Sequence, residues 1–389
     1  MRNRILFLTP GPIDFPIGSG EVLRKIVQAL PPASVCWASL SRGVFDQADN
    51  VLACKSFPPA DKVGWRLRNS FFGFWCIREL EARVRARRIA EWASQYAPGV
   101  LWILAEGEAV GTGYHLGRLT QLRTHLTFHD APEIITARFG NFTRPVRKLY
   151  MRRLRRLISL SSGLDAVSAE LAHHARKMAD NNWHGSTMVF PPSLPGPARK
   201  RVRGYSGKCR RIGFCGTLRA SADQWKNFVG RLTALPFNFE ITAFADAEYF
   251  PKVDAPSGIR LLLKECVKDR RFEAVFSEEE FDACYLPLYR DSDWDLFVRT
   301  SLSSKLATYA LSGTPIIVDG PSDSVAWRLV LKYRAGVLSD DMEGLSRLFA
   351  DSQTREVLAD GSRAMFEKEF DLDRNVQRFR RVLDGHESV

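Results

Sequence analysis

The chain has 389 residues, of which 45% are hydrophobic and 26% charged, so it is long enough for two domains with ordinary buried cores. This composition excludes intrinsic disorder and a collagen-like fibre. The formal net charge of +12 indicates either an anionic partner (nucleotide, nucleic acid, acidic polymer or acidic membrane) or a basic surface without a dedicated partner.

The cysteines and the N-terminus bear on the compartment. The seven cysteines are odd in number, scattered, and contain no Cys-x-x-Cys pair, which argues against a disulfide framework and against a zinc site. The apolar run after Arg4 is too short for a signal-peptide core, and no apolar run reaches the roughly 18 residues of a membrane-spanning helix. We therefore expect a cytoplasmic protein.

The first half of the chain alternates strands and helices. Residues 5–8 form an apolar run typical of a buried parallel strand, residues 10–20 a Gly/Pro-rich turn, and residues 21–30 a helix with one apolar face. This order is the first unit of a Rossmann-like fold. Further strands are predicted over 35–40, 100–104 and 122–128, and another short strand ends at 166–168. Helices are predicted over 77–95 and 150–160.

A second α/β unit begins near residue 210. Strands are predicted over 212–215, 239–244, 259–263, 283–286 and 316–318, and a closing helix from residue 370 onward. The Pro-rich, basic segment 191–208 is expected to be a linker outside both cores. We therefore predict an N-terminal domain over 1–190, a C-terminal domain over 209–369, and a tail over 370–389 that packs back on the first domain.

The segment from Ser303 to Pro315 carries the most specific chemistry. A helix that begins near Ser303 points its free N–H groups and positive dipole end at the carboxyl edge of the sheet. Ser303 and Ser304 can cap this helix and donate hydrogen bonds, and Lys305 adds a positive charge to the first turn. Because the dipole disfavours a cation there, a lysine at this place indicates a bound anion such as a diphosphate.

This Ser-x-Lys-x-x-x-Tyr helix, ending in Gly-x-Pro before an apolar strand, resembles the C-terminal domain of GT-B glycosyltransferases. The resemblance is closest to the retaining family 4-like group and to bacterial exopolysaccharide glucuronosyltransferases. It implies two Rossmann-like domains that face each other across a cleft, with Ser303, Ser304 and Lys305 on the nucleotide diphosphate. The family commonly has Glu or Gln where this chain has Thr308, a shorter side chain that brings no charge.

Other segments contribute predicted donor-binding residues. The run Gly213-Phe-Cys-Gly-Thr-Leu-Arg resembles the family's pyrophosphate motif, with an ordinary turn as the alternative. The first Gly-rich turn lets backbone approach a phosphate, or simply caps a helix. Together these segments and the loop after residue 287 supply Gly18, Ser19, Gly20, Thr217, Arg219, Lys226 and Tyr289.

Ionisable residues at two strand ends are candidates for the chemistry on the acceptor. His129 and Asp130 follow the strand 122–128, and the resemblance places a sugar-contacting His or an acceptor-activating Asp at this edge. We assign His129 to a donor or leaving-group contact and Asp130 to the acceptor hydroxyl, with a structural turn as the alternative. Glu106 is the reserve candidate, and Glu21 joins it as an acceptor-binding prediction.

No metal is expected at the donor site. Three alternating carboxylates occur at Asp291, Asp293 and Asp295 and could attract a cation. The positive charges above offer a metal-free way to stabilise the leaving diphosphate. We therefore predict a metal-independent enzyme without cofactors, the nucleotide-sugar being a substrate.

Residues 144–158 contain seven basic residues and no acidic one. An amphipathic helix of this kind can bind an anionic membrane surface, which suits a lipid-linked acceptor, or it can pack on the core with a solvated basic face. Nucleic-acid binding is not expected, because no recognisable motif accompanies the charge.

Together these features predict a glycosyltransferase that moves a sugar from a UDP- or GDP-linked donor to a hydroxyl acceptor, with retention implied by the resemblance. The acceptor is a glycan, a lipid-linked saccharide or a small molecule. Two alternatives remain: a nucleotide-sugar epimerase or hydrolase of the same fold, and a non-catalytic binder of nucleotide-sugars.

Overall fold

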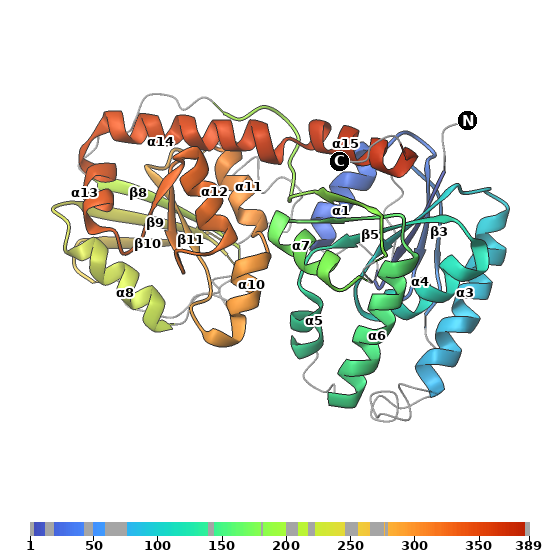
Figure 1. Ribbon diagram of the computed structural model, residues 1–389. Helices are drawn as coiled ribbons and strands as arrows, with labels where there is room; N and C mark the ends of the chain where they lie inside the picture. The colour runs from blue at the N-terminus through green and yellow to red at the C-terminus, as the bar shows by residue number, and fades with distance from the viewer. Residues whose placement is uncertain are drawn as a thin grey trace. The chain divides into compact units, whose positions relative to one another are not determined.

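The computed structural model describes residues 4–11, 19–42, 50–58, 76–138, 144–179, 182–199, 209–216, 222–245, 256–264, 276 and 279–385. The chain divides into two compact units, Met1–Pro191 with Asp373–Val389 and Pro192–Leu372. Each unit is a parallel sheet with helices packed on it (Figure 1). This architecture confirms the predicted α/β fold of two Rossmann-like domains.

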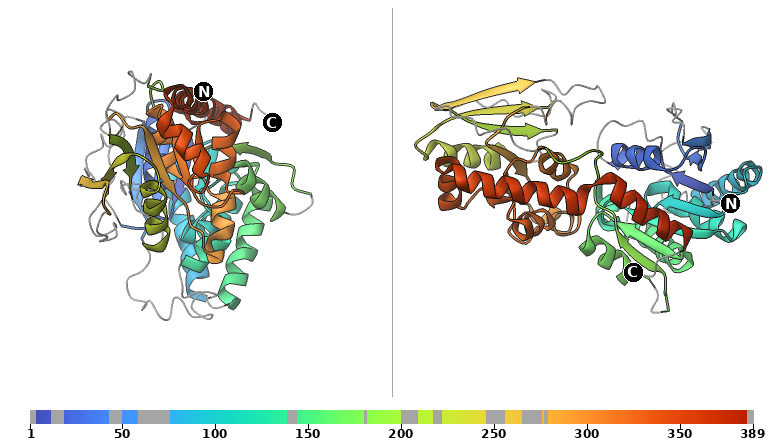
Figure 2. Two further views of the ribbon diagram at one scale, coloured as in Figure 1. Left: turned by 90° about the vertical axis from the view of Figure 1, so that its left-hand side faces the viewer. Right: turned by 90° about the horizontal axis from the view of Figure 1, so that it is seen from above.

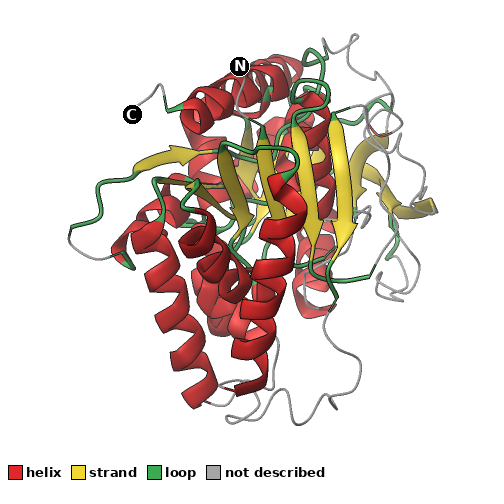
Figure 3. Ribbon diagram, turned by 90° about the vertical axis from the view of Figure 1, so that its right-hand side faces the viewer, coloured by secondary structure: helices red, strands yellow, loops and turns green. Residues whose placement is uncertain are grey.

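The first unit contains a parallel sheet of seven strands in the order β3-β2-β1-β4-β5-β6-β7. Its central strands are buried along their length, which explains their continuous apolar sequences. Figure 3 shows these strands side by side with helices against them. Their bounds are β1 Ile5–Thr9, β2 Val35–Ser39, β3 Val51–Ser56, β4 Val100–Leu104, β5 Arg123–Phe128, β6 Gly163–Ala166 and β7 Ser186–Val189.

The helices of the first unit connect consecutive strands, as parallel pairing requires. Helices α3 and α6 both pack against α4. Ser168 caps α7 by accepting a hydrogen bond from the Leu171 N–H. The bounds are α1 Ser19–Ala29, α3 Arg78–Ser94, α4 Gly107–Thr120, α5 Pro132–Arg138, α6 Arg144–Leu160 and α7 Ala169–Lys177.

The second unit contains a parallel sheet of six strands in the order β10-β9-β8-β11-β12-β13. The strands β8, β9 and β10 lie side by side in Figure 2, and β11 continues the sheet from β8. Their bounds are β8 Cys209–Cys215, β9 Asn238–Phe244, β10 Ile259–Lys264, β11 Ala283–Pro287, β12 Ile316–Asp319 and β13 Gly336–Leu338.

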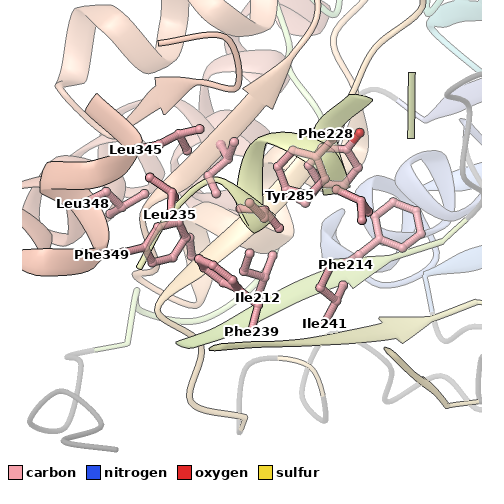
Figure 4. Close-up of a cluster of buried hydrophobic side chains, with 14 of the residues drawn as sticks. Ile212, Phe214, Phe228, Leu235, Phe239, Ile241, Tyr285, Leu345, Leu348 and Phe349 are labelled. Carbon is pink, nitrogen blue, oxygen red and sulfur yellow. The ribbon is translucent and has the colours of Figure 1, made fainter. Parts of the chain in front are cut away.

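Helix α8 and the short helix α13 share one apolar cluster with the sheet of the second unit (Figure 4). In this cluster the rings of Phe228 and Tyr285 stack at 3.9 Å. Helices α11 and α12 pack against β11 and β12 and against α14. The bounds are α8 Ala222–Thr233, α10 Asp295–Thr300, α11 Ser304–Leu311, α12 Val325–Tyr333, α13 Met342–Ala350 and α14 Ser352–Met365.

The last helix, α15 (Leu372–Asp384), belongs to the first unit apart from its first residue. The ring of Phe379 packs edge-on against Trp102, His125 and Phe190 with centroid distances of 4.9, 5.4 and 5.4 Å. The C-terminal helix therefore completes the core of the N-terminal sheet, as the expected return of the tail requires.

The segment predicted as a linker is buried where it begins, so the expectation that it lies outside both cores is wrong there. Ser193 is 1% and Leu194 7% exposed. The Leu194 N–H donates to the Phe370 carbonyl, and the Leu372 N–H donates to the Leu194 carbonyl. The two places where the chain passes between the units are thus joined by backbone hydrogen bonds. These bonds give partners to buried N–H and carbonyl groups that would otherwise have none.

Candidate functional site

The strand order of the second unit locates its ligand edge. From β8 the chain goes on to β9 and β10 on one side of the sheet, and from β11 to β12 and β13 on the other. Neighbouring strands whose connections diverge mark a topological switch point, and ligands of such sheets bind beyond the carboxyl ends of the strands there. We call the carboxyl ends of β8 and β11, with the first turn of α11, the switch-point edge.

Helix α11 begins at this edge as predicted from the sequence. Ser303 takes the N-cap position with extended dihedrals, but its side chain makes no capping hydrogen bond. Ser304 is exposed, whereas Thr308, one turn further along, is buried. The helix ends at Leu311, and Gly313, just after its C-cap Ser312, has a φ of +63°, a conformation that glycine adopts without strain.

Lys305 lies against the carboxyl end of β8. A Cβ placed on Gly216 would meet the Lys305 Cε at 3.2 Å, and the φ of Gly216 is +78°. The ammonium group lies 5.9 Å from the centre of the Phe214 ring. The structure therefore brings together the lysine and the glycine of two motifs that are far apart in the sequence.

Tyr309 lies one turn after Lys305 and is the tyrosine of the Ser-x-Lys-x-x-x-Tyr motif, for which no role was predicted. Its hydroxyl accepts a hydrogen bond from the Cys215 N–H at 3.1 Å and donates one to the Tyr285 carbonyl at 2.9 Å. Burial raises the pKa of the Tyr309 hydroxyl well above its usual range, so the group stays protonated and can donate.

Asp319, at the end of β12, is fully buried and was also missed. It accepts hydrogen bonds from the Tyr285 hydroxyl at 2.6 Å, from the Ser339 hydroxyl at 2.7 Å and from Arg290 at 3.0 Å. An acidic residue at the end of an apolar strand is the sequence signal from which Asp319 could have been predicted. A polar cavity of about 220 Å³ adjoins it, lined by Asp223, Gln224, Asn227, Arg231, Arg290 and Asp319.

The loop after β11 is ordered by aromatic stacking. The rings of Tyr289 and Trp294 lie 4.3 Å apart and nearly parallel. Within the acidic run, Asp295 is paired with Arg299 at 2.8 Å. Among the described residues no group of three or more His, Cys, Asp or Glu side chains is placed to hold a metal ion.

The remaining predicted donor-binding residues are only partly described. Thr217, Arg219 and Gly18 lie outside the described residues. Lys226 is exposed on α8.

The Gly-rich turn of the first unit ends earlier than predicted. Ser19 and Gly20 form the first turn of α1 rather than the turn before it, so the helix begins two residues before the expected Glu21. The side chains of these three residues lie outside the described part of the structure. Helix formation by Ser and Gly here follows from packing of the apolar face of α1, since Leu23 and Ile26 are buried.

His129 and Asp130 follow β5 directly, as predicted, at the carboxyl edge of the first sheet. His129 is 8% exposed, and its Nδ1 has no hydrogen-bond partner. Burial lowers the pKa of His129, although the carboxylates of Asp165 and Asp130 act in the opposite direction. The imidazole is therefore neutral at pH 7, while Asp130 is half-buried.

Glu106 is the N-cap residue of α4, at the end of β4. Its side chain makes no capping hydrogen bond, and the following Gly107 has a φ of +50°. Burial, and to a lesser extent the nearby Glu106 carboxylate, raise the pKa of the buried Tyr150 hydroxyl. Glu106 thus stands beside a residue of the basic helix α6.

A buried polar network crosses three strands of the first sheet and was not predicted. The Trp102 indole N–H donates to the Thr127 hydroxyl at 2.7 Å, and this hydroxyl donates to Asp165 at 2.6 Å. His125 contacts the same carboxylate oxygen at 2.8 Å. Asp165 is only 2% exposed, so the network satisfies a carboxylate that water does not reach.

Helix α6 presents the basic face that its sequence predicts. Val146, Tyr150, Leu154, Leu157 and Ile158 are buried. The exposed basic residues of the helix are Arg147, Lys148, Arg152, Arg155 and Arg156.

One cation of α6 turns inward, where Arg153 pairs with Glu79 of α3. The neighbouring α3 adds the exposed apolar side chains Leu80 and Val84. No helix in the described part of the chain is both long enough and apolar enough to cross a membrane.

Comparison with known proteins identifies the fold. HepE from Anabaena, solved in complex with UDP, is 13% identical with a TM-score of 0.63, and the match covers 98% of this chain and 100% of that chain. Sucrose-phosphate synthase from Thermosynechococcus elongatus is 12% identical with a TM-score of 0.65, over 98% of each chain. The lipopolysaccharide outer core galactosyltransferase WaaB is 11% identical with a TM-score of 0.64, over 99% of this chain and 100% of that one.

These matches show that the chain has the GT-B fold implied by the resemblance of its sequence motifs. No family model and no curated protein sequence matches the chain. At identities this low the likeness extends to the fold alone.

Proposed function

We propose that the protein is a glycosyltransferase that moves a sugar from a nucleotide-sugar to a hydroxyl acceptor. The observation that carries the proposal is Lys305, in the first turn of α11, lying against Gly216 at the switch-point edge. A cation at the positive end of a helix is unfavourable unless an anion lies between them, and a diphosphate provides that anion. Its charge also grows as the sugar leaves, so the same groups stabilise the transition state.

Structural neighbours support a uridine nucleotide as the first donor to test. HepE has been solved with UDP and with UDP and glucose, and an E. coli trehalose-6-phosphate protein with UDP-2-fluoro glucose. We propose a UDP- or GDP-linked donor, retention of anomeric configuration and independence from metal ions.

The acceptor chemistry is assigned to the edge of the first sheet. In our proposal Asp130 orients or deprotonates the acceptor hydroxyl, and His129 contacts the sugar or the leaving group. A neutral, buried imidazole suits a hydrogen-bonding role better than a charged one. Asp130→Asn should then lower kcat by roughly 100-fold or more while nucleotide affinity stays the same. Equal turnover by the variant would exclude this role.

A thermal-shift panel of UDP-, GDP-, dTDP- and CMP-sugars tests the donor proposal. At a 100-fold excess over Kd, the correct donor should raise Tm by roughly 5 °C. Lys305→Ala should remove the shift, and Lys332→Ala, an exposed lysine on α12 of the same unit, should not. If no nucleotide shifts the wild type, or both variants respond as it does, the proposal fails.

Product analysis separates transfer from the alternatives. Incubation with the donor and candidate acceptors should give a glycosylated acceptor in the presence of EDTA. Donor consumption without transfer would instead indicate an epimerase or hydrolase of the same fold. Binding without any turnover would indicate a non-catalytic binder, a reading that Thr308 at the usual Glu or Gln position favours.

We further propose that the protein acts in the cytoplasm on the inner membrane surface and takes a membrane-linked acceptor. The exposed basic face of α6 supports this, as does the lack of disulfide bonds among the cysteines that the structure describes. Each basic residue near an anionic surface contributes about 1 kcal/mol. Charge reversal of Arg152, Arg155 and Arg156 to Glu should therefore weaken binding to phosphatidylglycerol vesicles by at least about 100-fold.

A matched variant controls for net charge. Reversal of Arg328, Lys332 and Arg334, on and just after α12, changes the charge of the protein by the same amount. Vesicle flotation should distinguish the two triple variants. Equal binding by both, or binding of the wild type to neutral phosphatidylcholine vesicles as strong as to anionic ones, would exclude the membrane role of α6.

A further inference from the structure

The ladder of hydrogen bonds between β8 and β11 stops before either strand does. Register pairing ends at Cys284 opposite Gly213, although β8 continues to Cys215 and β11 to Pro287. In a parallel ladder of this register, the next bond would run from the Cys215 N–H to the Tyr285 carbonyl. That bond is absent, and both groups are buried.

The hydroxyl of Tyr309 takes the place of the missing bond. It accepts from the Cys215 N–H at 3.1 Å and donates to the Tyr285 carbonyl at 2.9 Å. Two hydrogen bonds in series separate the two backbone groups by roughly twice the distance of one. The Cys215 N–H and the Tyr285 carbonyl both keep a hydrogen-bond partner, so β8 and β11 can diverge without leaving either buried group unpaired.

The same helix face carries Lys305 and Tyr309, which are four residues apart. Tyr309 is fully buried, so its position is fixed by the core. Lys305 lies against Gly216, the residue directly after the bridged Cys215. The hydrogen bond from the Cys215 N–H to the Tyr309 hydroxyl ties helix α11 to the end of β8. It therefore helps to fix the distance between Lys305 and Gly216.

We propose that Tyr309 is a positioning residue for the donor diphosphate, an inference that rests on the proposed function. Its hydroxyl holds the carboxyl ends of β8 and β11 apart at the switch-point edge. This separation keeps the Lys305 ammonium and the backbone of Gly216 directed at one anion. Tyr309 itself does not contact the donor.

Tyr309→Phe removes the hydroxyl and little volume. The Cys215 N–H and the Tyr285 carbonyl then either pair directly, which draws β11 toward β8, or stay unsatisfied. Both outcomes displace Gly216 relative to Lys305. We expect affinity for UDP to fall by roughly tenfold, the effect of one well-placed hydrogen bond to a charged group.

The decisive readout is the ratio of UDP affinity to UMP affinity, measured by isothermal titration calorimetry. A general loss of stability would weaken both nucleotides, whereas misplacement of the diphosphate contact weakens UDP and leaves UMP within about twofold. Tyr333→Phe is the matched control, because its hydroxyl donates to Glu369 in the same unit and away from this edge. It should leave both affinities unchanged.

Coupling with Lys305 provides a second criterion. If both residues act on the same phosphate, Lys305→Ala and Tyr309→Phe should not be additive, and the double variant should bind UDP about as weakly as Lys305→Ala. Additive losses, an unchanged UDP/UMP ratio in Tyr309→Phe, or an equal effect of Tyr333→Phe would each overturn the inference.

A measurement on the wild type covers the case in which Tyr309→Phe does not fold. With ¹⁵N-cysteine labelling, the amide signal of Cys215 should shift on addition of UDP and much less on addition of uridine. No shift with bound UDP would overturn the positioning role. Failure of the wild type to bind any nucleotide is a different result, because it removes the proposed function itself.

Discussion

The two sheets share the strand order 3-2-1-4-5-6 but differ at the switch point. In the first sheet β1 pairs with β4 at four successive positions, from Ile5 opposite Val100 to Leu8 opposite Ile103. In the second sheet β8 pairs with β11 at only two, and a tyrosine hydroxyl occupies the next position. The same order of six strands therefore goes with continued backbone pairing between the two central strands in the first sheet, and with a bridging side chain between them in the second.

Polar side chains are also distributed differently. The first sheet has a polar network within it, where Trp102, Thr127 and Asp165 are hydrogen-bonded across three strands, in addition to His129 and Asp130 at its edge. In the second sheet the polar groups described above gather at the strand ends, around Asp319 and Lys305. Strand order therefore locates the carboxyl edge of each sheet, while the side chains beside the last paired residues differ between the two sheets.

The largest effect is expected from reversal of charge at the open edge. Lys305→Glu should weaken UDP binding by at least about 100-fold, because it places a carboxylate where the diphosphate is proposed to bind. Isothermal titration calorimetry measures the UDP affinity of this variant, with Lys332→Glu as the control. Retained UDP affinity in Lys305→Glu would show that the edges of the two sheets do not differ in the way proposed.

Loss of the carboxylate at the end of β12 should destabilise the second unit strongly. Asp319→Ala leaves the Tyr285 hydroxyl, Ser339 and Arg290 without their common acceptor, at a cost of about 3 kcal/mol. Urea unfolding measures this free energy. Asp340→Ala, a half-exposed neighbour 3.6 Å from Arg290, should cost less than about 0.5 kcal/mol. Equal costs would contradict a structural role for Asp319.

The network inside the first sheet should matter for stability alone. Thr127→Val removes the acceptor of the Trp102 N–H and a donor to Asp165, which we expect to cost about 1–3 kcal/mol. Thr120→Val, at the end of α4 in the same unit, is the control and should change the free energy of unfolding by less than about 0.5 kcal/mol. A loss of UDP affinity in Thr127→Val would show that the two sheets are not independent.

The smallest expected effect is a dependence of the free energy of unfolding on pH, caused by His129. Because burial lowers the pKa of His129 in the folded protein, the unfolded chain binds a proton more readily, so stability falls as pH drops below about 6.5. Between pH 7 and 5.5 this loss is at most about 1 kcal/mol. His129→Gln should flatten the urea-unfolding curve against pH, and His184→Gln, an exposed histidine, should not. Identical slopes would exclude His129 as the cause.

Strands with continuous apolar sequence were predictable to within a few residues. The strand predicted over 100–104 is observed as Val100–Leu104, and that over 239–244 as Asn238–Phe244. The strands Val51–Ser56, Ser186–Val189 and Gly336–Leu338 were not predicted. The first two are edge strands whose side chains are mostly half-buried, and the third has only three residues, so none has the apolar run that marks a buried strand.

The start of helix α11 was predictable because a helix start has a local signature. Ser303 and Ser304 mark the first turn of α11 as residues that favour a helix N-terminus. The bridge made by Tyr309 was not predictable, since it depends on where pairing between β8 and β11 ends, and these strands are far apart in the sequence. Asp319 was missed for a similar reason: its partners come from β11 and from the end of β13.

The return of α15 to the first sheet has a consequence for synthesis. Trp102, His125 and Phe190 are synthesised before the C-terminal domain, but Phe379, whose ring packs against them, is synthesised after it. During translation the core of the N-terminal domain is therefore completed only after the C-terminal domain has been produced. Until then the surface that Phe379 covers in the folded protein stays exposed.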